Sequence, residues 1–144
     1  MILRDFKISD LDEYPQFRDM DKDVQDVVRG SLRNYIERAY TLEHDGRLIC
    51  SAGFIMLFPG VANGYAWGYF SDLIHKYPIA THKIMIKMID TAEKKYGLKR
   101  LQVDCVKGFG RAIKWLEHLG FEYEGEMRRY GPNGETMLRF GRVS

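Results

Sequence analysis

Apolar residues along this chain recur every second residue in some segments and every third or fourth in others, which separates predicted strands from predicted helices. Arg100 to Val106 is short, rich in apolar residues and bounded by Gly97 and Gly108, so it predicts a buried strand. The next segment has helical spacing, with apolar side chains at Ala112, Trp115, Leu116 and Leu119. Gly120 follows, where a left-handed cap would end this helix.

The N-terminal third predicts one strand and two helices. Met1 to Phe6 reads as the strand, and Ser9 with Asp12 resembles a capping box that opens a helix shortened by Pro15. Asp23 is the expected cap of the second helix. The apolar stripe predicted for that helix consists of Val24, Val27, Val28, Leu32, Tyr35 and Ala39.

The middle of the chain predicts a hairpin and a further strand. Tyr40 to Glu43 and Leu48 to Phe58 flank an Asp45-Gly46 turn, which is a strong hairpin signal. Pro59 to Gly64 has the composition of a loop. Gly64 to Asp72 alternates as a strand, with Tyr65, Trp67 and Tyr69 on one face.

The remaining segments complete one predicted domain, residues 1–144. Ile79 to Tyr96 is a helix stopped by Gly97, with a stripe of Met85, Met88, Ile89, Ala92 and Tyr96. Phe121 to Tyr130 and Glu135 to Val143 form a final hairpin around residues 131–134. The predicted order is β-α-α-β-β-β-α-β-α-β-β, and 144 residues that are 45% hydrophobic suit one core.

The composition limits which cell compartment and which ligands are expected. Leu48 to Phe58, the longest nearly apolar run, is too short to span a bilayer, and charges from Arg4 onward argue against a signal peptide. Cys50 and Cys105 lie on separate predicted strands, which favours buried thiols in a reducing cytoplasm. The four histidines and two cysteines show no metal-ligand spacing, so no metal is expected.

Charge is distributed unevenly. Residues 1–72 carry 8 Lys/Arg against 12 Asp/Glu, and residues 73–144 carry 14 against 8. A basic half would attract an anionic ligand and an acidic half a cationic amine, although solvated surfaces explain the same counts. The basic residues are not interleaved densely with aromatic ones, which disfavours nucleic acid without excluding it.

The strand, glycine turn and short helix that ends in Leu119-Gly120-Phe121 resemble the C-terminal half of the GCN5-related N-acetyltransferases. Ala112 and Ile113 match the same family pattern, and the predicted order of elements agrees over the whole chain. The resemblance implies an α/β (α+β) fold, with a mixed, mostly antiparallel sheet of six to seven strands flanked by about four helices. It also implies acetyl-CoA as co-substrate and a primary amine that attacks the thioester directly.

The family's coenzyme-binding loop is altered in this chain. Its usual glycines, which let backbone N–H groups approach the pyrophosphate, are absent from Lys76-Tyr77-Pro78-Ile79-Ala80-Thr81. Pro78 suits a first helical turn and Thr81 offers a hydroxyl, so an anion site remains reasonable beside the alternative of an ordinary helix start. The resemblance further implies pantetheine contacts at Ser71 and Leu73, and Phe109 replaces an Asn that usually contacts pantetheine.

The catalytic groups also depart from the family. Leu116 stands where a Tyr commonly protonates the departing thiolate, so that proton must come from another group or from solvent. Asp72 and Asp104 are the candidate bases. A carboxylate in a strand like that of Asp104 should have a raised pKa unless it is paired, and pairing with Lys or Arg is the alternative. Tyr123 and Tyr130 are candidate donors, or packing residues.

A narrower resemblance is to small acetyltransferase-like proteins of tailed phages, including the internal virion protein A group. It rests on the segment from Gly110 to Phe121, on Leu116 and on the glycine-poor loop, and it implies a host cytoplasm or a virion. Three functions therefore stay open: an N-acetyltransferase, a degenerate non-catalytic binding or virion protein, and a modifier of nucleic-acid amines. The acceptor would approach the acidic run of Asp19, Asp21, Asp23 and Asp26, and a homodimer is one reading of the aromatic face and the last hairpin.

Overall fold

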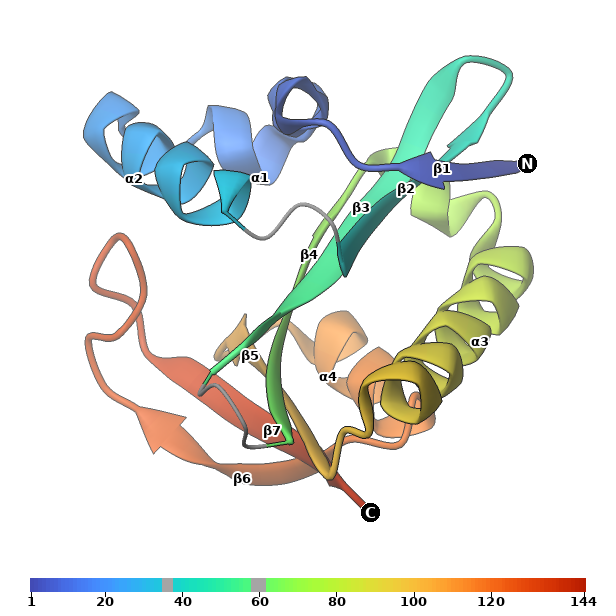
Figure 1. Ribbon diagram of the computed structural model, residues 1–144. Helices are drawn as coiled ribbons and strands as arrows, with labels where there is room; N and C mark the ends of the chain where they lie inside the picture. Colours follow the sequence, from blue (N-terminus) through green and yellow to red (C-terminus); the bar gives the residue numbers. More distant parts are fainter. Residues whose placement is uncertain (35–37, 58–61) are drawn as a thin grey trace. The chain divides into compact units, whose positions relative to one another are not determined.

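The computed structural model describes residues 1–34, 38–57 and 62–144 (Figure 1). The strands are β1 Ile2–Asp5, β2 Ala39–His44, β3 Arg47–Met56, β4 Asn63–Phe70, β5 Arg100–Val106, β6 Glu122–Met127 and β7 Met137–Val143. The α-helices are α1 Pro15–Arg18, α2 Lys22–Arg33, α3 Pro78–Tyr96 and α4 Gly110–His118, and two 3-10 helices span Ile8–Glu13 (η1) and Asp72–His75 (η3). The predicted order of strands and α-helices is confirmed.

The strands form one sheet in the order β1-β2-β3-β4-β5-β7-β6. The described pairings are antiparallel except for β4 with β5, which run parallel. The predicted mixed, mostly antiparallel sheet with flanking helices is therefore confirmed. By their contacts the residues divide into an N-terminal unit, 1–55 with 67–78, and a C-terminal unit, 56–66 with 79–144.

The N-terminal unit is built on the predicted hairpin. Asp45 and Gly46 both have positive φ, 50° and 73°, as a two-residue hairpin turn requires. Its core contains Phe6, Leu11, Tyr14, Phe17, Leu32 and Ala39, with Trp67 and Tyr69 of β4 packed against it. The Phe6 and Trp67 rings meet edge to face at 5.1 Å, so for Trp67 and Tyr69 core packing accounts for the aromatic face.

Three details of the predicted first helices are wrong. Asp21, not Asp23, is the N-cap of α2, and Asp23 lies in the first turn. Ser9 opens no helix, because η1 is entered from Lys7, whose backbone N–H donates to the Asp10 carboxylate at 2.9 Å. Pro15 begins α1 at its first position, where a missing N–H has no consequence.

The predicted stripe of α2 is also partly wrong. Val28 packs against the core and Leu32 belongs to it, whereas Val27 is 67% exposed. At about 100° per residue, Val27 lies at the margin of the row formed by Val24, Val28 and Leu32. Ala39 is the first residue of β2 rather than a helical residue. Tyr35, the last residue of the predicted strand (Phe58) and residues 59–61 of the predicted loop lie outside the described residues.

The C-terminal unit has an apolar and a polar face on the same strands. Leu101, Leu138 and Phe140 alternate onto one face and are at most 7% exposed. Arg142 of β7, on that face, pairs with Asp90 and Glu93 of α3, which places α3 against it. The opposite face of β5 carries Arg100, Gln102 and Asp104.

The glycines predicted to end α3 and α4 are confirmed. Gly97 follows α3 with φ 62°, and Gly120 follows α4 with φ 91°. Only glycine adopts such angles at little conformational cost, so both helices stop where the sequence predicts. The Trp115 indole of α4 donates to Nδ1 of His82 at 3.1 Å, which ties α4 to α3.

Candidate active site

An open pocket of about 890 Å³ lies within the N-terminal unit, and several predicted site residues line it. They are Ser71, Asp72, Leu73 and Lys76, all from the segment that follows β4. Arg18 of α1 and Arg47 of β3 add exposed cations to the lining. Three of the predicted coenzyme-binding residues and one predicted base therefore line the same pocket.

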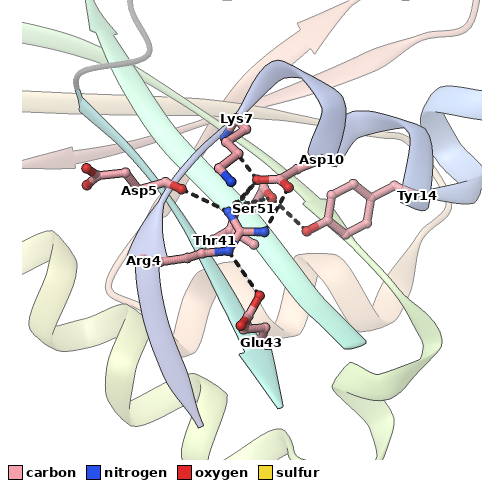
Figure 2. Close-up of polar contacts among 8 residues, drawn as sticks. All are labelled: Arg4, Asp5, Lys7, Asp10, Tyr14, Thr41, Glu43 and Ser51. Atoms are coloured by element: carbon pink, nitrogen blue, oxygen red, sulfur yellow. Dashed lines mark hydrogen bonds and ion pairs between the residues drawn. The ribbon is translucent and has the colours of Figure 1, made fainter. Parts of the chain in front are cut away.

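Arg4, which is hydrogen-bonded to two carboxylates, forms part of this lining (Figure 2). Arg4 donates from Nη1 and Nη2 to the two oxygens of Asp10, both at 2.9 Å, and from Nε to Glu43 at 3.0 Å. All three nitrogens of the Arg4 guanidinium are thus bonded to carboxylates. Because of these bonds, above all to Asp10, the pKa of Arg4 is raised.

A chain of hydroxyls continues from Asp10 into the interior (Figure 2). Thr41 donates to Asp10 at 2.8 Å, and hydroxyls of Thr41 and Ser51, and of Ser51 and Tyr14, are each 2.7 Å apart. Burial opposes ionisation of Asp10, but hydrogen bonds from Arg4, the Lys7 N–H and Thr41 outweigh it, so the pKa of Asp10 is lowered. Burial raises the pKa of Tyr14. No sequence pattern predicted this network, whose only local signal is an arginine and an aspartate at the two ends of a strand-to-helix junction.

The segment after β4 is held by its own bonds. The strand ends at Phe70, so Asp72, predicted at the end of a strand, instead begins η3 and is exposed. Ser71 donates from Oγ to the Leu48 carbonyl at 2.6 Å and accepts the Leu73 N–H at 3.2 Å. The ammonium of Lys76 lies 5.6 Å from the centre of the Tyr77 ring and remains exposed.

The start of α3 contains a hydroxyl without a partner. Pro78 is the first residue of α3, and Ile79, the second, is 71% exposed. Thr81 is 1% exposed, and its Oγ1 finds no hydrogen-bond partner in the described part of the chain. An unpaired buried hydroxyl costs about 1–3 kcal/mol, so a partner for it would be stabilising.

A second polar cluster lies on the polar face of the C-terminal unit. Asp104 of β5 and Arg139 of β7 are directly opposite in the antiparallel ladder. Arg139 donates from Nε and Nη2 to the two oxygens of Asp104, at 3.0 and 3.2 Å, and the Asp104 side chain is only 4% exposed. The alternative considered for Asp104, a pair with a neighbouring cation, is what the structure shows.

Two tyrosines flank this pair. The Tyr65 hydroxyl of β4 donates to Asp104, and burial, followed by that bond, raises the pKa of Tyr65. The guanidinium of Arg139 lies 5.8 Å from the ring centres of both Tyr65 and Tyr130. Tyr130, in the β6–β7 connection, is 54% exposed, so this cluster reaches solvent.

The other predicted residues of the C-terminal unit lie apart from this cluster. Tyr123 pairs with Phe140 across β6 and β7, so it is on the face opposite Asp104, and it is 56% exposed. Phe109 precedes α4 and is 63% exposed. Leu116, at the position of the family's usual acid, is half-buried in α4.

In residues 1–34, 38–57 and 62–144, no group of three or more His, Cys, Asp or Glu side chains could hold a metal ion. None of the helices in the described ranges is both long and apolar enough to cross a membrane.

No protein-family model and no curated protein matches the sequence. Solved structures are similar over the whole chain. A point mutant of spermidine N-acetyltransferase SpeG from Vibrio cholerae has a TM-score of 0.73 at 14% identity, covering 99% of this chain and 95% of that chain. Ribosomal-protein-alanine N-acetyltransferase from Brucella melitensis has a TM-score of 0.73 at 14% identity, covering 100% of both.

An acetyltransferase of the GNAT family from Bacillus anthracis is similar too, with a TM-score of 0.68 at 15% identity, covering 98% of this chain and 93% of that chain. The strand order and the parallel β4–β5 pair agree with the fold that the resemblance in the sequence implies. The chain has the fold of the GCN5-related N-acetyltransferases.

Proposed function

We propose that the protein transfers the acetyl group of acetyl-CoA to a primary amine. The observation that carries this proposal is the likeness to N-acetyltransferase structures, which covers at least 98% of the chain with TM-scores near 0.7. Since folds host many functions, the site must supply the rest of the argument. A short parallel ladder and a helix start with unpaired donors are the features that support it.

The start of α3 is our candidate for the coenzyme diphosphate. The first-turn N–H groups of a helix have no intrahelical partner and carry partial positive charge, which suits a phosphate. Thr81 adds a hydroxyl that lacks a partner, and Lys76 adds an exposed cation. Lys76 and Thr81 are the side chains we expect to contribute, with Tyr77, Pro78, Ile79 and Ala80 contributing backbone or packing contacts.

Pantetheine contacts are proposed at Ser71, Leu73 and Phe109. The Ser71 hydroxyl already bonds to Leu48 and caps η3, so we expect backbone groups to make most of the contacts there. Phe109 is exposed and apolar, and its contact with pantetheine stays a prediction from the sequence resemblance.

In the proposed reaction the amine nitrogen attacks the thioester carbon, the C–S bond breaks and the thiolate leaves. The ammonium nitrogen must lose its proton first, and the thiolate gains one from another group or from solvent because Leu116 cannot donate. Asp72 is exposed and is the candidate base on the pocket lining, since both oxygens of Asp104 already accept hydrogen bonds. The roles of Asp72, Asp104 and Tyr123 stay predictions.

The compartment is proposed from the cysteines. Both are free thiols, and burial raises the pKa of Cys50 to about 12, which makes it unreactive. A reducing cytoplasm is therefore our proposal. Phage origin and a homodimer stay predictions that the sequence alone supplies, and a nucleic-acid partner stays disfavoured by the sequence.

Calorimetric titration with acetyl-CoA, and with free CoA for comparison, tests the proposal. Saturable binding is expected, and Lys76→Ala should weaken it about tenfold, because a charge-assisted contact is worth about 1.5 kcal/mol or more. Lys87→Ala, an exposed lysine in the middle of α3, is the matched control. A screen of amines for thiol release follows.

Binding without thiol release from any amine would favour a non-catalytic protein of the same fold. Absence of binding at millimolar coenzyme would contradict the proposal outright, and unchanged affinity in Lys76→Ala would remove Lys76 from the site.

A further inference from the structure

The polar cluster of Tyr65, Asp104, Tyr130 and Arg139 lies where the parallel strands β4 and β5 stop pairing. Their ladder comprises three pairs and ends at Tyr65 opposite Gln102. Asp104 is two residues further along β5, so its side chain projects from the same face as Gln102. In open α/β sheets, ligands bind beyond the carboxyl ends of parallel strands. The cluster therefore has the location of a ligand site.

Arg139 has donors to spare. Asp104 takes Nε and Nη2 of its guanidinium, whereas Nη1 makes no hydrogen bond among the described residues. The Arg139 side chain is 28% exposed, so these donors are not sealed from solvent. A guanidinium presents a planar fork of N–H donors that suits carboxylate oxygens.

Two arginines that are unpaired within the described residues directly precede this cluster's Tyr130 along the chain. Arg139 and Arg100 pair with Asp104 and Glu124, Lys107 pairs with Glu126, and Glu122 is the remaining carboxylate of β6. Arg128 and Arg129 are exposed and form no ion pair within the described ranges. Both directly precede Tyr130, whose ring contacts Arg139.

Stability alone does not account for the Asp104–Arg139 pair. Replacing a buried ion pair by well-packed apolar residues is often neutral or stabilising. The opposite face of the same strands is apolar at Leu138 and Phe140, so the sheet tolerates apolar pairs nearby. The two hydrogen bonds from Arg139 to Asp104 would instead fix the orientation of the Arg139 guanidinium.

We propose that Arg139, oriented by Asp104 and flanked by Tyr65 and Tyr130, binds a carboxylate on the amine acceptor, which makes the acceptor an amino acid. This inference rests on the proposed function and specifies its substrate class. A carboxylate suits a site in which Asp104 neutralises Arg139 but leaves it an N–H edge unused by the described residues, and in which Arg128 and Arg129 supply positive charge unpaired within them. Asp104 is then a positioning residue and Arg139 a specificity-determining one.

Paired acceptors test the inference. Each L-amino acid is compared with its carboxamide, which keeps the reacting amine and lacks the charge, and thiol release is followed in the wild type and in Arg139→Gln. We expect kcat/KM to favour the amino acids by about tenfold or more in the wild type, the value of a charge-assisted hydrogen bond. Arg139→Gln should abolish that preference while leaving the affinity for acetyl-CoA within about twofold. Arg33→Gln, an exposed arginine at the end of α2, should behave as wild type.

Arg139→Lys guards against a folding defect, because it keeps a cation beside Asp104 and loses only the planar fork. It should fold and show a reduced preference. A second readout is binding of the amino acid without coenzyme, measured by NMR titration. Amino-acid binding that is lost in Arg139→Gln, in a protein that fails to transfer acetyl, would support the carboxylate site and reject the proposed function.

Two results would overturn the inference. One is equal kcat/KM for amino acids and their carboxamides in an active wild-type enzyme. The other is a preference, or amino-acid binding, that Arg139→Gln leaves intact.

Discussion

Two arginine–aspartate pairs in this protein are almost equally buried yet differ in what they leave free. Arg4 and Asp10 have side chains 27% and 7% exposed, and Arg139 and Asp104 have side chains 28% and 4% exposed. Arg4 bonds carboxylates through all three nitrogens, whereas Arg139 uses two. Burial alone therefore does not separate a structural pair from a binding group; the number of unused donors does.

The neighbours of the two pairs differ in the same direction. The hydroxyl chain from Asp10 ends at Tyr14, which is fully buried, whereas Arg139 ends beside Tyr130, which is 54% exposed. A closed network fixes η1 on the sheet of the N-terminal unit, and an open one presents donors to solvent. The first should govern stability and the second recognition.

Exchanging each arginine for glutamine should have the largest effect and separates the two pairs. Arg4→Gln leaves Asp10 and Glu43 as two carboxylates without their cation, and breaking a buried pair costs about 3–5 kcal/mol in the free energy of unfolding. Arg139→Gln removes the cation from one carboxylate, Asp104, rather than from two, so a smaller loss of about 1–3 kcal/mol is expected. Urea unfolding at neutral pH measures both.

Arg33→Gln is the control for these exchanges, and as an exposed substitution it should change the free energy of unfolding by less than about 0.5 kcal/mol. A loss in Arg139→Gln as large as in Arg4→Gln would break the comparison, because the open pair would then be as structural as the closed one.

The free energy of unfolding should also depend on pH in the acid range, with a smaller effect that comes mainly from Asp10. Its pKa is lowered in the folded protein, so its ionised form contributes stability that is present above the unfolded pKa, about 4, and is lost as pH falls through the lower folded value. The free energy of unfolding should fall between about pH 5 and pH 2, and this fall should be shallower in Asp10→Asn. Urea unfolding across that range is the measurement.

Asp12→Asn is the matched control, because Asp12 is exposed and pairs with Arg29 at the surface. Its acid profile should follow the wild type. A profile in Asp10→Asn as steep as the wild type's would assign the acid sensitivity to other carboxylates.

Local patterns predicted the elements well, for reasons visible in particular residues. Asp45-Gly46 and Gly120 require positive φ, so the sequence marks the hairpin and the end of α4 directly. The stripe of α2 was overextended because periodicity does not say how wide the buried face is, and Val27 lies at its margin. Capping preferences placed the start of α2 at Asp23, although Asp21 makes no side-chain cap and packing sets the boundary.

The candidate sites were harder to predict because their members are far apart in sequence. Asp104 stood out as a carboxylate in an apolar strand, but its partner Arg139 is fixed by the β5–β7 register, which no local pattern specifies. The same register, with a bulge between Tyr123 and Gly125, puts Tyr123 on the other face. The network of Arg4 joins residues of β1, η1, β2 and β3, so only the assembled sheet reveals it.

Substitution of Thr81 should have the smallest effect on stability. Unlike the two arginine–aspartate pairs, its hydroxyl has no hydrogen-bond partner among the described residues. Thr81→Val removes the hydroxyl and keeps the shape, so the free energy of unfolding should stay level or rise by up to about 1 kcal/mol. Thr91→Val, at an exposed position of the same helix, controls for the change in helix propensity. If the hydroxyl meets the coenzyme diphosphate, calorimetry should show weaker acetyl-CoA binding in Thr81→Val only. A clear loss of stability there would mean that the hydroxyl is already satisfied, and the argument for an anion at the start of α3 would lose its strongest side chain.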